Sequence, residues 1–124
     1  MIIYTFGYNS NSLQYFEAKV KELDAIVVDV RFNPNSFSPF WTRKNLEKCF
    51  SSYKHVPSLG NKKYKEKGVM EIVDLNSGCE EVISMMELGF NCILLCACLN
   101  LEECHRKIIA EEISKKTKCE IIHL

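Results

Sequence analysis

Continuous apolar runs and helical apolar spacings alternate along the chain, and this alternation predicts strands joined by helices. The runs MIIYTF (1–6), AIVVDV (25–30) and CILLCA (92–97) are rich in strand-forming residues. Such runs are typical of strands that are covered on both faces. Two shorter runs, YKHVP (53–57) and CEIIHL (119–124), predict further strands.

Apolar residues three and four positions apart predict the helices between these strands. Residues that can cap a helix precede four of these patterns: Ser12, Thr42 before a helix to about Tyr53, Ser77 with Glu80, and Asn100 with Glu103. Residues 61–75 fit a strand or a helix equally well. Alternating strands and helices indicate a parallel sheet. We therefore expect an α/β fold: a single three-layer domain over residues 1–124, with a mainly parallel sheet of about five strands flanked by helices.

Polar and reactive residues gather where the predicted strands end. They are Tyr8, Asn9 and Ser10, then Asp29 and Arg31, then Gly60, then Cys96, with Cys104, His105 and Arg106 near the start of the next helix. Ligands of parallel sheets bind outside the carboxyl ends of the strands. We therefore expect these side chains to form one ligand-binding pocket.

The charges favour an anion as the ligand of this pocket. The net charge is zero, but residues 43–67 carry eight Lys and Arg against two Glu, with aromatic residues between them. This pattern suits a phosphate-bearing ligand, a nucleotide or a nucleic acid, although a solvated lysine-rich loop explains it as well. Arg106, close to a helix N-terminus, favours an anion, and an exposed helical arginine is the alternative. Arg31 lies two residues after Asp29, so the pair can bind a ligand together or form a structural salt bridge.

The cysteines allow a second kind of site. Cys96 is a candidate nucleophile if Arg106 or His105 stabilises its thiolate, with Cys98 or Cys104 as a resolving thiol. A small buried residue without chemistry is the alternative. The cysteines and His105 also offer four soft metal ligands, but neighbouring helical residues project roughly 100° apart, which makes joint ligation awkward. We therefore predict no metal and no cofactor.

Several classes of protein are excluded or disfavoured. No arginine follows Cys96 or Cys98 at the spacing of a phosphatase or sulfurtransferase loop, and the glycine patterns of dinucleotide and phosphate-binding loops are missing. No apolar run has the length of a membrane span, and the start lacks a signal-peptide pattern. An odd number of cysteines, seven, fits free thiols in a reducing compartment. We expect a cytoplasmic protein that does not bind membranes. The sequence indicates no oligomeric state.

Short segments along almost the whole chain resemble the domain of unknown function 488 family, small α/β proteins of bacteria and archaea. These segments are TFGYNS, SLQYF, IVVDVRFNP, FSPFW, HVPSLG, LLCAC, CHRKIIAEEI and EIIHL. The resemblance implies a common pocket lined by Gly7, Ser10, Asp29, Arg31, Pro34, Leu59, Gly60, Cys96, Cys104, His105 and Arg106. It implies no particular reaction.

The chain departs from the pattern of the family it resembles at three positions. The family has His where Tyr8 stands, Gly where Asn61 stands and Glu where Cys98 stands. A His and a Glu are natural acid–base groups near neutral pH. The resemblance therefore implies that His105 transfers protons here, or that the pocket has lost or changed its chemistry.

The sequence thus supports three hypotheses about function. The first is an anion-binding cleft at the carboxyl ends of the strands, with a hydrolase or glycosidase-type reaction in which Asp29 and His105 are the acid–base candidates. The second is a thiol-dependent enzyme that uses Cys96. The third is a non-catalytic module whose basic face docks a partner.

Overall fold

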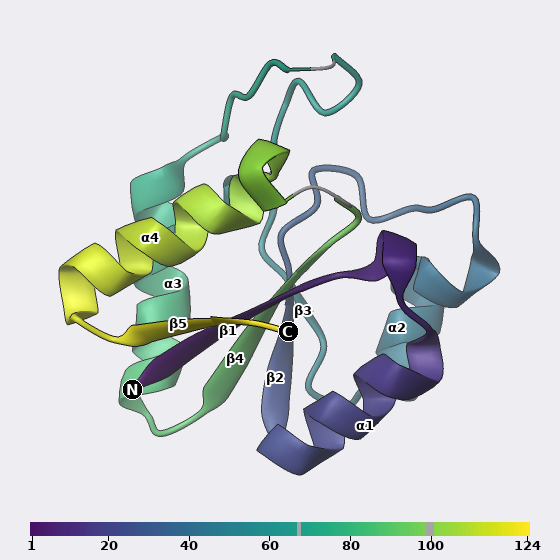
Figure 1. The fold of residues 1–124 in the computed structure, drawn as a ribbon, viewed down its shortest axis with the longest axis horizontal. Coiled ribbons are helices and arrows are strands. Elements are labelled where there is room, and N and C mark those ends of the chain that lie inside the picture. Colours follow the sequence, from purple (N-terminus) through teal and green to yellow (C-terminus); the bar gives the residue numbers. More distant parts are fainter. Residues whose placement is uncertain (67, 99–100) are drawn as a thin grey trace.

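Five parallel strands form one sheet in the computed structural model, which describes residues 1–66, 68–98 and 101–124 (Figure 1). The order across the sheet is β3-β2-β4-β1-β5. The strands are β1 (Ile2–Gly7), β2 (Ala25–Asp29), β3 (Lys54–His55), β4 (Asn91–Cys96) and β5 (Glu120–His123). The predicted α/β class with a mainly parallel sheet is therefore confirmed.

Four α-helices in the described ranges connect the strands and cover both faces of the sheet. They are α1 (Leu13–Leu23), α2 (Arg43–Cys49), α3 (Leu75–Glu87) and α4 (His105–Thr117). Helices α1 and α2 lie on one face, and α3 and α4 lie on the other (Figure 1). No helix in this part of the chain combines the length and the apolar character that crossing a membrane requires.

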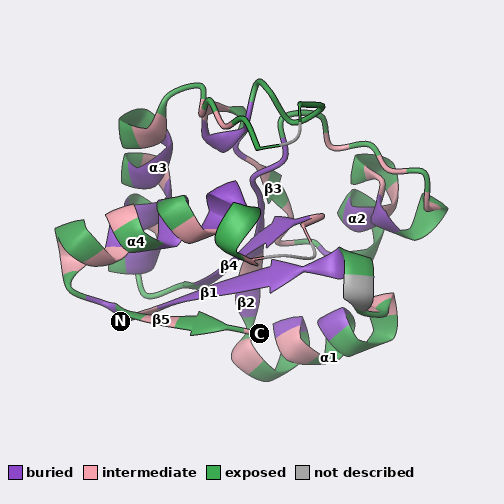
Figure 2. Ribbon diagram, turned by 45° about the horizontal axis from the view of Figure 1, so that its top comes forward, coloured by how far each residue is buried: buried purple, intermediate pink, exposed green. Residues whose placement is uncertain are grey.

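The sheet separates two apolar cores. Successive side chains of a strand point to opposite faces, so Leu94 packs with α3 and α4, whereas Ile93 and Leu95 pack with α1 and α2. Figure 2 shows β1, β2 and β4 buried and the edge strand β5 largely exposed. The continuous apolar runs of the sequence are the central strands, as expected for strands covered on both faces.

The helix starts agree with the sequence at two of the four predicted caps. The hydroxyl of Ser12 accepts a hydrogen bond from the Tyr15 amide, and the hydroxyl of Thr42 accepts one from the Asn45 amide. Helix α2 ends at Cys49, earlier than predicted.

The other two predicted caps differ from the structure. Helix α3 begins at Leu75, because the carboxylate of Asp74 accepts a hydrogen bond from the Ser77 amide and caps the helix before Ser77 can. Helix α4 begins at His105, with Cys104 at its N-cap, because a separate 3₁₀ turn at Leu101–Glu103 precedes it. The predicted cap Asn100 lies outside the described residues. Residues 61–75, which fitted either element, contain a single antiparallel bridge between Asn61 and Ile72 before α3 starts.

Strands β1 and β4 are neighbours whose connections leave in opposite directions. The chain after β1 passes to the face of α1, and the chain after β4 passes to the face of α4. Gly7 at the end of β1 pairs with Cys96 at the end of β4. Diverging connections open a crevice at the carboxyl edge of a parallel sheet. The fold therefore places the ends of β1, β2 and β4 around one hollow.

The start of α3 gives a direct test of the observed cap. We expect Asp74→Ala to lower the free energy of unfolding by about 1 kcal/mol, because it removes the acceptor for the Ser77 amide. The matched control, Ser77→Ala, keeps that amide and should change stability little. Denaturant unfolding measures both values, and a larger loss in the Ser77 variant would support the capping box predicted from the sequence.

Candidate functional site

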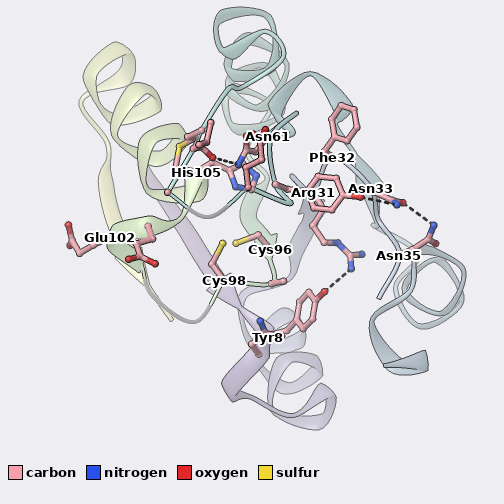
Figure 3. A pocket seen from close by; sticks show the side chains of 18 residues that line it. Tyr8, Arg31, Phe32, Asn33, Asn35, Asn61, Cys96, Cys98, Glu102 and His105 are labelled. Atoms are coloured by element: carbon pink, nitrogen blue, oxygen red, sulfur yellow. Dashed lines mark hydrogen bonds between the residues drawn. The ribbon is translucent and has the colours of Figure 1, made fainter. Parts of the chain in front are cut away.

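A pocket of about 490 Å³ opens at the carboxyl edge of the sheet (Figure 3). It lies between the segments that follow β1, β2 and β4 and the loop that contains Asn61 and Tyr64. Five of the predicted site residues line it: Tyr8, Asn9, Arg31, Cys96 and His105. The structure thus brings these five residues, from distant segments of the chain, to one hollow.

A buried ion pair between Asp29 and Arg31 lies at the end of β2, and its arginine lines the pocket. Arg31 Nε is 2.8 Å from one carboxylate oxygen of Asp29, and Nη2 is 2.6 Å from the other. The hydroxyl of Tyr53 donates to the same carboxylate at 2.5 Å. Burial and the adjacent carboxylate raise the pKa of Tyr53, which keeps it a proton donor. Asp29 itself is not among the described residues that line the pocket, and its oxygens are engaged by these donors.

Arg31 uses its remaining donors to hold the aromatic wall of the pocket. Its Nη1 donates to the Trp41 carbonyl at 2.6 Å and to the Tyr8 hydroxyl at 3.2 Å. The rings of Tyr8 and Trp41 are stacked, with centroids 4.7 Å apart. The Asp29 carboxylate balances the charge of this guanidinium, so Arg31 has the geometry of the structural salt bridge, one of the two alternatives that the sequence left open.

Arg106 is buried at the start of α4 and points at sulfur. Its side chain is 6% exposed, so the alternative of an exposed helical arginine is wrong. Nη1 lies 3.2 Å from Cys96 Sγ, 3.4 Å from Cys104 Sγ and 3.1 Å from the Cys98 carbonyl oxygen. A side chain at Gly7 would place its Cβ 2.6 Å from this nitrogen. The close approach of the guanidinium therefore requires glycine at the end of β1.

Three cysteines surround this guanidinium. The sulfur atoms of Cys96, Cys98 and Cys104 all lie within 4.8 Å of one another, and Cys96 Sγ is 2.7 Å from Cys104 Sγ. Figure 3 shows the sulfur atoms of Cys96 and Cys98 close together at the pocket. All seven cysteines of the sequence fall in the described ranges and are free thiols.

The three thiols titrate very differently. Burial would raise the pKa of Cys96, but hydrogen bonds from Cys104 and Cys98 and the charges of His105 and Arg106 lower it well below that of an ordinary thiol. The hydrogen bond to Cys96 raises the pKa of Cys104 strongly. For Cys98, the hydrogen bond with Cys104 lowers the pKa, but the bond to Cys96 and burial outweigh it, giving about 11. Of the three thiols, Cys96 is therefore the one whose surroundings favour the thiolate.

His105 lines the pocket next to this cluster. Its Nε2 lies 2.7 Å from the Val30 carbonyl oxygen, so this nitrogen carries the proton and donates it. The bond joins the start of α4 to the end of β2 and fixes the ring orientation. His105 is not part of the group of metal-binding side chains found in the described residues, which comprises the three cysteines alone.

The sulfur atoms are close enough to share a thiophilic metal ion. No metal was predicted from the sequence, because Cys104 and His105 are awkward joint ligands. In the structure the side chains grouped closely enough to bind a metal are the three thiols. The Arg106 guanidinium, within 3.4 Å of two of these sulfurs, adds a positive charge that opposes a cation. The arrangement is suited above all to a stabilised thiolate.

The remaining predicted residues lie at different distances from the pocket. Gly60 packs against the backbone of Phe32, where a Cβ would lie 2.5 Å from the Phe32 Cα, and it does not line the pocket among the described residues. The side chain of Ser10 lies outside the described part of the structure. Of the basic segment 43–67, Asn61, Tyr64 and Glu66 line the pocket, and Lys67 lies outside the described residues.

The sequence did not identify several residues that shape the pocket. Phe32, Asn33 and Asn35 line it directly after the end of β2, and their position after a predicted strand is a signal that could have found them. Tyr53, which binds Asp29 across the sheet, had no such signal because the contact joins residues 24 positions apart.

These features define a parallel α/β protein with a pocket at the carboxyl edge of its sheet, walled by a buried cysteine cluster. The chain belongs to the family described as "Domain of unknown function DUF488", whose model matches residues 13–113. The resemblance found in the sequence motifs is therefore confirmed. No curated protein and no solved structure matches the chain.

The buried ion pair predicts a large effect on stability. Asp29→Asn should lower the free energy of unfolding by about 3–5 kcal/mol, because it leaves the Arg31 guanidinium buried without a counter-charge. The control is Glu47→Gln, which breaks the exposed pair with Arg43 and should cost less than about 1 kcal/mol. Denaturant unfolding compares the two, and equal small losses would show that the buried pair contributes no more than a surface one.

Proposed function

We propose that the protein is a thiol-dependent enzyme in which the Cys96 thiolate attacks an electrophilic atom of a small ligand in the pocket. The contact that supports this most directly is the 3.2 Å approach of Arg106 Nη1 to Cys96 Sγ. A guanidinium at this distance stabilises a thiolate, and the thiolate is the reactive form of cysteine.

The charge balance of Arg106 supports the same proposal. A buried cation is costly unless an anion lies beside it. Within residues 1–66, 68–98 and 101–124 no carboxylate forms an ion pair with Arg106, whereas Arg31 has Asp29. Of the two sulfurs in contact with Arg106, that of Cys96 has the lowered pKa and is the better counter-charge.

The surroundings of Cys96 suit a small polar ligand. Cys96 lines the pocket although only 1% of it is exposed, and the partly exposed Cys98 lies beside it. The amides of Asn33 and Asn35 and the hydroxyl of Tyr64 offer hydrogen bonds across the hollow. Small reagents should therefore reach the thiolate more readily than bulky ones. In this proposal His105 donates or accepts a proton at the ligand, and Asp29 positions Arg31 and Tyr53.

Alkylation kinetics test the proposed nucleophile. With iodoacetamide at pH 7, Cys96 should react faster than the exposed Cys49, and its rate should level off at a lower pH, because a lowered pKa leaves more thiolate near neutrality. Arg106→Met should raise the pKa of Cys96 and slow its alkylation at pH 7 by about tenfold or more, because less of the thiol is then ionised. Peptide mass spectrometry identifies the modified cysteine.

Two further variants serve as controls for this measurement. Arg106→Lys keeps a positive charge and should recover part of the rate, whereas Arg43→Met removes an exposed arginine and should leave the rate unchanged. If Cys96 reacted only after denaturation, or no faster than Cys49 at any pH, the proposal would be wrong.

A second candidate function is the binding of a phosphate-bearing ligand or nucleic acid. The observation that favours it is the place of the basic segment, because Tyr64 and Glu66 line the pocket and exposed lysines stand at 62, 63 and 65. Clustered cations beside a pocket attract polyanions. The ion pairs of Lys62 with Glu71 and of Lys63 with Glu66 offset part of this charge.

Salt dependence tests this second candidate. Binding of the protein to duplex DNA should weaken steeply as salt is raised, and replacing Lys62, Lys63 and Lys65 by Gln should reduce the salt slope by about one for each lysine that contacts a phosphate. The matched control replaces Lys21, Lys115 and Lys118, which are exposed and do not line the pocket. Equal slopes for the two triple variants would exclude this segment as the binding surface.

A further inference from the structure

We infer that Cys96 and Cys104 form a reversible redox pair that exchanges with small disulfides entering through the pocket. This inference rests on the proposed thiolate nucleophile and names its substrate class. The observation behind it is the 2.7 Å separation between the two sulfur atoms, which come from the end of β4 and the N-cap of α4.

The placement of the two sulfurs gives them different roles. Cys96 lines the pocket, whereas Cys104 is 1% exposed and is not among the described residues that line it. An incoming disulfide therefore meets Cys96 first. Cys104 then reaches Cys96 from within the protein, without leaving its place at the start of α4.

The chemistry requires no reagent beyond the disulfide. The Cys96 thiolate attacks one sulfur of the ligand, a mixed disulfide forms, and the other half leaves as a thiolate. The Cys104 thiolate then attacks Cys96 Sγ and the Cys96–Cys104 bond forms. The half of the ligand that was bound to Cys96 leaves as a thiolate. The proton of Cys104 ends on a departing thiolate. The protein has lost a pair of electrons and the ligand has been reduced to thiols; small thiols reverse both steps.

The electrostatics of the cluster order these steps. While Cys96 is a thiolate, its hydrogen bond and charge hold the proton on Cys104. When Cys96 has formed a mixed disulfide, Cys104 no longer has this hydrogen-bond acceptor or this negative charge beside it. Arg106 Nη1, 3.4 Å from Cys104 Sγ, then stabilises the second thiolate. The same guanidinium thus serves both sulfurs in turn.

Cys98 has a supporting part in this scheme. Its carbonyl oxygen accepts a hydrogen bond from Arg106, and its thiol, whose pKa is raised to about 11, stays protonated and donates to Cys96. Because Cys98 belongs to the site, the matched control for replacement of Cys104 by Ser is Cys49→Ser, which removes an exposed thiol that does not line the pocket.

Trapping of intermediates tests the inference on the full, reduced chain with bis(2-hydroxyethyl) disulfide, a small uncharged disulfide, as the probe. Wild type and Cys49→Ser should end with a Cys96–Cys104 disulfide and release both halves of the probe as thiols. Cys104→Ser should stop at one half of the probe attached to Cys96, and in Cys96→Ser the thiol of Cys104 should remain reduced. Peptide mass spectrometry distinguishes these products, and circular dichroism confirms that each variant is folded.

The outcomes separate this inference from the proposed nucleophile. If Cys96 alkylates fast but wild type accumulates the mixed disulfide with the probe as Cys104→Ser does, Cys104 is not a resolving thiol and only the inference is overturned. A disulfide between Cys96 and Cys98 overturns it as well. If Cys96 neither alkylates nor exchanges because freshly purified protein holds a stoichiometric metal ion at the thiols, both proposals are overturned.

Discussion

The arrangement of the site depends on the contacts that the buried guanidinium of Arg106 makes. It donates to two sulfurs and to the Cys98 carbonyl, and it thereby joins the end of β4 to the start of α4. Gly7 on the neighbouring strand leaves the space that it occupies. Because a buried cation needs an anion, this placement makes a thiolate at Cys96 part of a balanced structure and not an isolated reactive group.

The two buried arginines have different counter-charges, and this difference divides the site. Arg31 is neutralised by the carboxylate of Asp29 and holds the aromatic wall through Tyr8 and Trp41. Arg106 faces sulfur. A carboxylate remains ionised across the ordinary pH range, whereas a thiolate can be consumed by reaction and restored. The first pair is therefore suited to structure and the second to chemistry.

The sequence predicted the elements better than their ends. Ser12 and Thr42 were identified as caps because each is the polar residue directly before its helix. Ser77 was not the cap, because the carboxylate of Asp74, three residues earlier, accepts from the Ser77 amide and starts the helix before Ser77. Helix α4 starts at His105 because a 3₁₀ turn comes first. Such choices depend on local competition between turns that hydrophobic spacing does not report.

By itself the sequence determined the parallel α/β fold, because apolar periodicity encodes which faces of strands and helices are buried. It also determined which residues lie at the strand ends, because polar residues follow each apolar run. Only the tertiary structure decided which of these groups meet. Cys96 contacts Cys104 and Arg106, and the carboxylate of Asp29 binds both Tyr53 and Arg31. Side-chain pairing across a sheet depends on strand order and register, which a local pattern of residue types does not specify.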